Sequence, residues 1–489
     1  MKKERIYKYL LYLLLYLNAF IIVLVYMTRV KFDVNTFDQI LFHLTQPMGD
    51  AAPHLIKSVA KHTVFKSVLS FLGVLLIAAV VHKITAKTAR KFSVKYIFTV
   101  NDSLYRKILG IFLAAGTVFM IFYGAFGLKI VPYLINSTKP YSLYYEKNYI
   151  YPLDKNIDFP RKNNLIVIHL ESIEKAHYKK EVFDNVLTPN IAKMSRENLS
   201  FTGYKQVFGT GWTIGSIFSS YCGVPLDVVI GDSNMYGRFK SFFSNLKCLP
   251  EILKDNGYRT CYMQGAGLGF AGKKKFFSQH GIDEMYGKDE FFTRGDFKEE
   301  YKGDWGVNDR ALFRYAKEKL KVFASGEGPF FFSVLTVNTH TPDGFLDPEC
   351  ESKFDKQLKN SVACVDCLLG EFMEWMEKQD FYKDTTIVIL GDHLSMPCML
   401  TSELQQDPNR EVVNIFINSL KTTEKTKRSF CMFDLMPTVI ESIGGEVKGG
   451  RLGLGTSLFC GKETLIEREG RWEFDEKIYE KSLLYESFR

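Results

Sequence analysis

The stretch Asn164–Ser172 reads NLIVIHLES, and it decides the fold. Leu165–Ile168 is an unbroken apolar run, typical of a strand that is buried on both faces. The run then reaches His169 and Glu171, where a core strand would continue with apolar residues. Burying a carboxylate is costly unless it has a partner. The stretch therefore indicates a central strand whose carboxyl end carries a residue of functional interest.

Two further apolar runs end in polar residues. TTIVILGDHLS, residues 385–395, ends on Asp392 and His393, and FFFSVLTVNTHTPDGF, residues 330–345, reaches His340. Expected strands are Leu165–Ile168, Arg259–Met263, Phe330–Val337 and Thr385–Leu390, and helix-like periodicity covers Ala311–Phe323, Ser361–Lys378 and Phe433–Ile443. Strands that alternate with helices predict an α/β domain, with a mostly parallel sheet between helices and ligands at the carboxyl ends of its strands.

Each of these polar residues is ordinary by itself. A lone strand-end Glu is more often solvated than functional, and an Asp-His pair or a single loop His is common. Three apolar strands that each end on a ligand-type residue favour a shared site. Glu171, Asp392 and His393 would then offer oxygen and nitrogen ligands to a divalent cation. Mn²⁺ or Mg²⁺ is expected because most of the ligands are oxygen, and the single His leaves Zn²⁺ open.

VFGTGWTIGSIFSS, residues 207–220, is a Gly-broken turn that leads into a helix. Its hydroxyl groups belong to Thr210, Thr213, Ser216, Ser219 and Ser220. Thr213 stands at the expected helix start, where the helix N-terminus favours an incoming anion. Ser219 and Ser220 lie further into the helix, where packing or local hydrogen bonding is expected. Thr213 is therefore the candidate nucleophile, and a cation on its oxygen would lower its pKa.

The net charge of +8 is unevenly distributed. Residues 1–135 carry 17 Lys and Arg against 5 Asp and Glu, whereas the remaining residues carry 46 against 50. The basic excess accompanies three apolar segments, at about 6–27, 66–84 and 108–135. This pattern is typical of membrane flanks and argues against a nucleic-acid partner.

About 20 helical residues cross the ~30 Å hydrocarbon core of a bilayer, so the first and third segments are long enough and the second needs its flanks. The first is too long for the apolar region of a cleaved signal peptide. Basic residues before the first span and between the second and third predict cytoplasmic loops. We therefore expect a membrane region at 1–135, a juxtamembrane linker at 136–163, an extracytoplasmic catalytic domain at 164–461 and a charged tail without assigned chemistry at 462–489.

Nine cysteines are compatible with an exported domain. Cys222 with Cys248, and Cys350 with Cys364 or Cys367, are candidate disulfides in an oxidising compartment. No second C-x-x-C pair accompanies the pair at 364 and 367, which argues against a zinc ribbon.

The motifs form an ordered set over about residues 160–460: VIHLES, GTGWTIGSIFSSYCGVPL, GYRTCYMQGAGLGFAGKKKFFSQHGID, DWGVND, LTVNTHTPDGF and LGDHLSM. This set resembles the membrane-anchored phosphoglycerol transferases of the alkaline phosphatase/sulfatase superfamily, which also includes the lipoteichoic acid synthases. The WTI turn and the THTPDGF stretch match the members that decorate periplasmic glucans of Gram-negative bacteria. The resemblance implies a sulfatase-like fold for the catalytic domain.

The resemblance also implies roles for individual residues. It makes Thr213 both nucleophile and metal ligand, together with the ligands Glu171, Asp392 and His393. It places Lys273 and His340 against the phosphoryl oxygens and the glycerol headgroup, and Trp305 in the lining of the site. One departure concerns Gln264, which stands where lipoteichoic acid synthases have a substrate-binding histidine. Ala271 and Lys273 likewise replace an aromatic residue and an Arg, so headgroup or acceptor preference can differ.

The reaction that the resemblance implies is transfer of a phosphoglycerol group from phosphatidylglycerol to a hydroxyl of an extracytoplasmic glycan. A phospho-threonine intermediate forms and diacylglycerol is released, at the bacterial inner membrane. The acceptor stays open among periplasmic glucan, lipopolysaccharide core, capsule and a growing glycerophosphate chain.

Alternatives are a phosphoethanolamine transferase that acts on a glycan or lipid A, and a related sulfatase-fold phosphodiesterase. A sulfatase is disfavoured because Cys222 lacks the C/S-x-P-x-R context. GLGFAGKK, residues 267–274, lacks the Ser or Thr of a P-loop.

Overall fold

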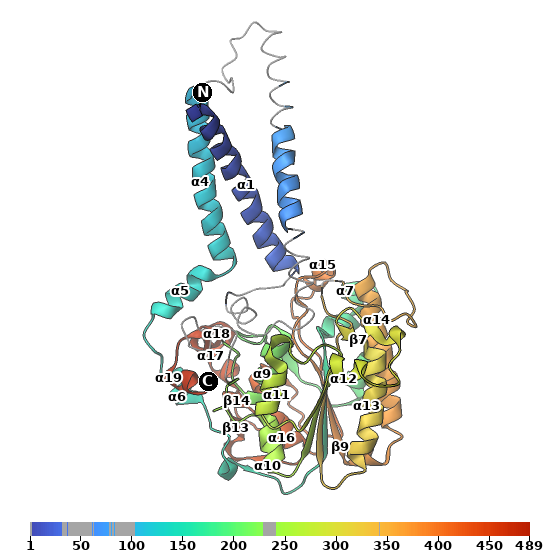
Figure 1. Ribbon diagram of the computed structural model, residues 1–489. Coiled ribbons are helices and arrows are strands. Elements are labelled where there is room, and N and C mark those ends of the chain that lie inside the picture. Colours follow the sequence, from blue (N-terminus) through green and yellow to red (C-terminus); the bar gives the residue numbers. More distant parts are fainter. Residues whose placement is uncertain are drawn as a thin grey trace. The chain divides into compact units, whose positions relative to one another are not determined.

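The computed structural model describes residues 2–31, 63–77, 103–227, 241–341 and 343–489, with single positions at 37, 61, 80 and 83. The chain divides into two compact units. One comprises residues 1–40 and 52–135, and the other residues 41–51 and 136–489. Figure 1 shows helices in the first unit and a layered arrangement of helices and strands in the second.

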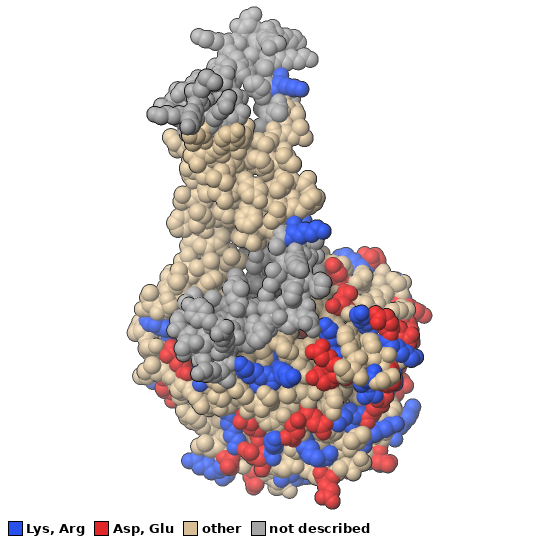
Figure 2. Space-filling view, viewed as in Figure 1, with Lys and Arg blue, Asp and Glu red and all other residues tan. Residues whose placement is uncertain are grey.

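The first unit contains two helices that are long and apolar enough to cross a membrane. They are α1 (Lys2–Lys31) and α4 (Ser103–Gly127), with candidate spans Tyr9–Met27 and Gly110–Gly127. Figure 2 shows almost no charged side chains on the visible, described part of this unit. A shorter apolar helix covers Thr63–Ile77. The predicted second span at 66–84 lies partly outside the described residues, so the three-span arrangement stays a prediction.

The helices α1 and α4 contact each other along their apolar surfaces. Asn18 Nδ2 donates to Thr117 Oγ1 at 3.0 Å, so a polar side chain of one helix is hydrogen-bonded to a polar side chain of the other. Such pairs are typical of helices that associate in an environment without water.

The second unit is built around a six-stranded sheet that is mostly parallel, as the sequence predicts, and that contains the four predicted strands together with two that were not predicted, β5 and β10. Its strand order is β10-β9-β2-β8-β4-β5, and β10 alone runs antiparallel to its neighbour. The bounds are β2 Asn164–Leu170, β4 Arg259–Gln264, β5 Glu284–Tyr286, β8 Phe330–Leu335, β9 Thr385–Gly391 and β10 Asn414–Ile417. The opening stretch, β2, lies inside the sheet between β9 and β8. Its apolar run is therefore buried on both faces.

Helices cover both faces of this sheet (Figure 1). Ile166 and Ile168 belong to the core cluster with α13 (Asp309–Ala324) and α14 (Gln357–Met376). On the opposite face lie α9 (Thr213–Cys222), α10 (Leu249–Asp255), α11 (Lys273–Gln279) and α16 (Leu435–Ser442). The three helices predicted from periodicity are confirmed as α13, α14 and α16, with ends shifted by a few residues.

His169, the first polar residue in the opening stretch, faces α9. Its Nε2 lies 3.0 Å from the Tyr221 hydroxyl, which also contacts Ser333 Oγ at 2.9 Å. Burial lowers the pKa of His169 to about 3, so the ring is neutral. His169 is therefore a hydrogen-bonded core residue.

The segments expected to be a linker and a tail fold into the second unit and contact each other. In α6 (Tyr144–Asn148), the buried Tyr145 hydroxyl donates to Ile478 O of α18 (Arg471–Tyr479) at 2.7 Å. Ile150 pairs with Gly453 in an antiparallel bridge. Both segments are polar in overall composition, but their apolar and aromatic residues pack against the rest of the unit.

The structure contains two disulfides. Cys222–Cys248 joins the end of α9 to the start of α10, and Cys350–Cys364 joins a loop to α14. The first candidate pair is confirmed, and the alternative at Cys350 is resolved in favour of Cys364. Cys367, one turn further along α14, is an exposed free thiol.

Candidate active site

The carboxyl ends of β2 and β9 lie side by side. Leu170 pairs with Gly391 in the parallel register, and Asp392 N donates to Leu170 O at 3.1 Å. The next residues along the two strands are Glu171 and Asp392, so both carboxylates leave the sheet at the same edge. The sheet register thus brings together two residues that are 221 positions apart.

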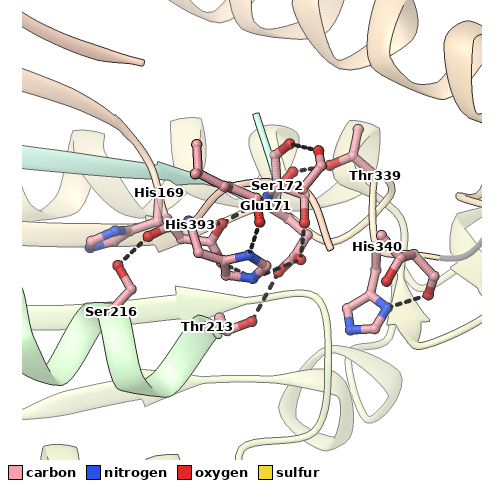
Figure 3. A network of polar contacts seen from close by, with 12 residues as sticks. His169, Glu171, Ser172, Thr213, Ser216, Thr339, His340 and His393 are labelled. Carbon is pink, nitrogen blue, oxygen red and sulfur yellow. Dashed lines mark hydrogen bonds and ion pairs between the residues drawn. The ribbon is translucent and has the colours of Figure 1, made fainter. Parts of the chain in front are cut away.

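These carboxylates form a compact cluster with His393. Ligand atoms of Glu171, Asp392 and His393 all lie within 4.8 Å of one another, and all three residues are buried. His393 Nε2 is 3.5 Å from both Glu171 Oε1 and Asp392 Oδ2. Its Nδ1 lies 2.9 Å from Leu394 O and donates there, which leaves Nε2 turned toward the carboxylates (Figure 3).

Two atoms of the cluster show that it suits a cation. Asp392 Oδ2 and His393 Nε2 are buried and have no hydrogen-bond partner among the residues that the structure describes. Buried polar atoms are rarely left unsatisfied, and such exceptions call for an ion, a water or a function. Oxygen and imidazole donors are suitable ligands for Mn²⁺, Mg²⁺ or Zn²⁺. The cluster can therefore hold a divalent cation.

The electrostatics of the cluster support the same interpretation. Burial would raise the pKa of Glu171, but the nearby His393 ring and the hydrogen bond from Ser172 hold that pKa below its usual value. Burial and repulsion from Glu171 raise the pKa of Asp392 to about 7. Burial opposes a charge on His393, yet attraction by Asp392 and Glu171 raises its pKa to about 10. Two carboxylates this close need a positive partner, either a proton or a metal ion.

Thr213 begins α9 and faces the cluster. Its Oγ1 donates to Glu171 Oε2 at 3.1 Å, while Glu171 Oε1 accepts from Ser172 Oγ at 2.9 Å (Figure 3). The hydroxyl thus lies at a helix N-terminus, where backbone N–H groups and the helix dipole favour an anion. All four residues of the predicted metal and nucleophile set therefore lie in one place.

Two glycines make this turn possible. Gly209 has φ +76°, and a Cβ there would meet Pro225 Cβ at 2.6 Å. A Cβ on Gly215 would meet Gly209 O at 2.6 Å. The Gly-broken pattern of the sequence is thus a packing requirement that sets where α9 begins.

Two neighbouring serines, Ser216 and Ser220, have other partners. Ser216 Oγ donates to Asp392 O, which ties α9 to the β9 end (Figure 3). Ser220 Oγ donates within the helix to Ile217 O at 3.0 Å. Of the hydroxyls in α9, Thr213 is the one that bonds to a carboxylate of the cluster.

Lys273, His340 and Trp305 come from three further segments. Lys273 begins α11 and is buried; burial lowers its pKa to about 8 against the attraction of Glu171 and Asp392. His340 and Trp305 have ring centroids 4.3 Å apart. Phe270, which sequence reasoning did not select, lies between them and Lys273, with its ring centroid 6.0 Å from that of Trp305 and 5.1 Å from Lys273 Nζ. Lys273, Trp305 and His340 are thus connected through a row of ring contacts that includes Phe270.

Further supporting residues were not predicted. Asp309, in the DWGVND motif, accepts from Val337 N at 2.8 Å and Asn338 N at 3.0 Å, and so fixes the loop that leads to His340. Thr339 Oγ1 donates to Glu171 O, and Thr336 Oγ1 accepts from Glu171 N at 3.0 Å. Asp309 ends the DWGVND motif and begins α13, so it does not follow an apolar strand as Glu171 and Asp392 do.

The side-chain amide of Gln264 hydrogen-bonds to neighbouring groups inside the protein. Its Nε2 donates to Ala266 O at 3.1 Å and Gly267 O at 2.8 Å, and its Oε1 accepts from the Tyr262 hydroxyl at 2.8 Å. The residue is buried. Gln264 therefore holds the loop after β4.

A second group of potential ligands has other roles. Cys248, Glu251 and His280 lie close together, but Cys248 is bonded to Cys222. His280 contacts Glu251 Oε2 at 2.7 Å and Phe242 O at 2.9 Å. These contacts explain the group without an ion.

Comparison with known families now places the chain. The family model described as Sulfatase matches residues 163–444, more than half of the sequence, and spans every element of the cluster. The chain belongs to the sulfatase family.

Two curated relatives of this sulfatase-family chain carry the name phosphoglycerol transferase I. The protein of Xanthomonas campestris is 30% identical over 306 residues, which cover 61% of this chain and 43% of that protein. The protein of Salmonella agona is 32% identical over 314 residues, which cover 63% and 40%. The match thus spans less than half the length of these relatives.

A solved structure supports the fold. A protein of the alkaline phosphatase superfamily from Vibrio parahaemolyticus aligns with a TM-score of 0.50 at 22% identity, over 64% of this chain and 72% of that one. At this level of identity the likeness concerns the sulfatase-family fold alone.

Within the sulfatase family, some members use a modified Cys or Ser as nucleophile. In this chain Cys222 is excluded from that role because its sulfur is bonded to Cys248. Thr213, whose hydroxyl donates to Glu171 from the start of α9, stays the candidate nucleophile.

Proposed function

We propose that this protein is a membrane-anchored phosphoglycerol transferase. It would move the phosphoglycerol group of phosphatidylglycerol to a hydroxyl of an extracytoplasmic glycan, such as a periplasmic glucan. The observation that carries the proposal is the 3.1 Å hydrogen bond from Thr213 Oγ1 to Glu171 Oε2, at the edge of a buried Glu-Asp-His cluster. The shared name of the two curated relatives supports the choice of headgroup.

In the first step, the Thr213 oxygen attacks the phosphorus of the lipid and forms a new P–O bond. The P–O bond to diacylglycerol breaks, and the diacylglycerol oxygen takes up a proton. The Thr213 hydroxyl proton leaves along the direction of Glu171 Oε2, to which it is already donated. A glycerophospho-threonine remains on the protein.

In the second step, a sugar hydroxyl attacks the same phosphorus. The P–O bond to Thr213 breaks, the sugar hydroxyl loses its proton while the Thr213 oxygen gains one, and the acceptor carries the phosphoglycerol group. Both steps place extra negative charge on the nonbridging oxygens, so catalysis depends largely on nearby positive charge.

Glu171, Asp392 and His393, together with Thr213, would hold Mn²⁺ or Mg²⁺, with Zn²⁺ as an alternative. When bound, the divalent cation would lower the pKa of the Thr213 hydroxyl and neutralise phosphoryl charge. Lys273 and His340 would donate to the phosphoryl oxygens or the glycerol hydroxyls. Trp305 and Phe270 would line the headgroup pocket and limit access of water.

A lipid donor explains why a catalytic unit is joined to apolar helices. Phosphatidylglycerol does not leave the bilayer readily, so the enzyme must remain beside the leaflet that holds it. We propose a multi-pass location in the bacterial inner membrane with the catalytic unit outside the cytoplasm. The disulfides Cys222–Cys248 and Cys350–Cys364 support this side, because disulfides persist in oxidising compartments.

The proposal is tested with detergent-purified protein, Mn²⁺ and phosphatidylglycerol labelled in its headgroup glycerol. We expect release of unlabelled diacylglycerol and label on the peptide that contains Thr213, detected by mass spectrometry. Thr213→Ala is the control and should carry no label. Label on a different residue would refute the assignment of Thr213 as nucleophile. A parallel reaction uses phosphatidylethanolamine labelled in its headgroup. Label from this lipid alone would show that the protein transfers phosphoethanolamine.

The location has its own test. A reporter enzyme that is active only outside the cytoplasm is fused after Arg489. An active fusion supports the proposed side, and an inactive fusion that is produced in full contradicts it.

A further inference from the structure

The C-terminal helix α18 contacts the segment that leads to Thr213. Arg471 Nη2 donates to Gln206 O at 3.0 Å, and Asp475 Oδ1 accepts from Phe208 N. The Phe208 ring also meets Tyr479 edge to face, with centroids 4.6 Å apart. Residues 206–213 are here named the nucleophile turn. The backbone of residues 206 and 208 is bonded to α18, and the Phe208 ring packs against the same helix.

The same turn is linked to the cation cluster. Gln206 Oε1 accepts from Leu394 N at 2.9 Å, and Leu394 directly follows His393. Gln206 therefore bridges the start of the nucleophile turn and the loop that carries two potential ligands. Because Arg471 bonds to the backbone of this same Gln206, α18 acts on both segments through one residue.

The turn also has hydrogen bonds within itself. Thr210 Oγ1 bonds back to Val207 within the turn, as donor to O at 2.7 Å and as acceptor from N at 3.1 Å. These contacts set the local shape of the turn but do not attach it to the sheet. The contacts from Arg471 and Asp475 supply an attachment from outside.

The helix α18 is itself anchored. Phe474 and Ile478, four residues apart on one side, are buried, and Phe474 packs against Tyr144 and Phe433. At its end, Asn136 Nδ2 donates to Tyr479 O at 2.6 Å, and Lys481 Nζ donates to Ser137 O at 2.7 Å. To position the nucleophile turn, α18 must itself be held by other parts of the unit. The contacts of Phe474, Tyr479 and Lys481 hold it in this way.

We propose that Arg471 and Asp475 are positioning residues, through which α18 holds the nucleophile turn in the geometry that presents Thr213 to the cation cluster and to phosphorus. This inference rests on the proposed role of Thr213. It assigns a catalytic contribution to a segment whose composition predicts only a charged tail. Misplacing a reacting group by about 1 Å can cost on the order of 10²-fold in rate.

The test compares four variants with wild-type protein in detergent. Arg471→Ala and Asp475→Ala remove the two contacts. Asp475→Asn keeps a carbonyl acceptor for Phe208 N. Glu473→Ala is the matched control, because Glu473 lies on the same helix, is exposed and pairs with Lys477 at 2.8 Å.

Two measurements are made on each protein. Single-turnover labelling of Thr213 from phosphatidylglycerol should slow by about 10- to 100-fold in the two alanine variants, with the half-saturating lipid concentration unchanged. Amide hydrogen exchange over 206–213 should speed up in the same two variants. Asp475→Asn and Glu473→Ala should resemble wild type in both measurements.

The outcomes separate the two levels of the proposal. Absence of Thr213 label in the wild-type protein overturns the proposed function, while exchange still decides whether α18 holds the turn. Wild-type labelling and exchange in both alanine variants overturn the positioning role alone. Should an alanine variant not fold, the wild-type Phe208 amide decides, because an unprotected amide there contradicts a bond to Asp475.

Discussion

Glu171 and Asp392 extend from adjacent parallel strands, one residue beyond the paired Leu170 and Gly391. Their carboxylates repel each other, which raises the pKa of Asp392 to about 7 after burial has raised it first. A bound cation removes this repulsion, so the pair acts as a unit that is stabilised by positive charge.

Asp392→Asn should weaken binding of Mn²⁺ in the absence of any substrate. The amide keeps the shape of the side chain but loses the charge that a cation requires. Loss of a residue that hydrogen-bonds to a metal ligand typically lowers metal affinity by about 10–100-fold. Loss of Asp392, a proposed ligand itself, should lower it by at least that much. Isothermal titration of purified protein measures the effect, with Glu446→Gln, an exposed carboxylate, as control. Equal affinity in wild type and Asp392→Asn would contradict the assignment of the ligand.

Thr213→Ala should abolish diacylglycerol release, by on the order of 10⁴-fold or more, because the nucleophilic oxygen is gone. Thr213→Ser keeps an oxygen that can donate to Glu171 and should retain measurable transfer. Near-UV circular dichroism should show the same fold in both variants. Turnover of Thr213→Ala at the wild-type rate would sink the covalent mechanism.

Lys273→Met should lower kcat by about 10²–10³-fold, because a buried charge that stabilises the phosphoryl oxygens is lost. Lys274→Met is the matched control, since Lys274 is the next residue and is exposed. Steady-state release of diacylglycerol from phosphatidylglycerol vesicles measures both. An equal effect of the two substitutions would indicate a general effect of surface charge instead.

Asp434 gives a prediction about stability and pH. Burial raises its pKa to about 7, although the Cys431 and Thr456 N–H groups favour its charged form. A carboxyl whose pKa is higher in the folded than in the unfolded state stabilises the fold fully below about pH 4, and this contribution is lost as pH rises toward 7.

Asp434→Asn removes that titration. The free energy of unfolding of the variant should therefore fall less than that of wild type between pH 4 and 7. The amide loses one of the two hydrogen bonds at every pH, which lowers the free energy of unfolding of the variant by a constant amount. The test is therefore how steeply the free energy of unfolding changes with pH, and its absolute value is not used. Denaturant unfolding of detergent-purified protein at several pH values measures it, and parallel curves would contradict the raised pKa.

The strands and their ends follow from local sequence. Leu165–Ile168 and Ile387–Leu390 have no polar side chain, so they are expected to be buried on both faces, and the polar residues that follow them are expected at an edge. The glycines at 209 and 215 likewise mark a turn in the sequence. The role of Asp309 could not be found in this way, because its partners Val337 and Asn338 lie in a separate segment and its short-range surroundings resemble a helix start.

The sequence by itself determined four of the six strands in the main sheet, the approximate ends of those four, and which side chains near those ends could bind a cation or attack phosphorus. Hydrophobic periodicity and residue chemistry are local properties, so they can be recognised within a single short segment. The tertiary structure decided that Thr213 donates to Glu171, that Cys350 pairs with Cys364, and that α18 bonds to the nucleophile turn. Those relationships depend on packing between segments far apart in the chain, where many partners are chemically acceptable and only the folded geometry selects one.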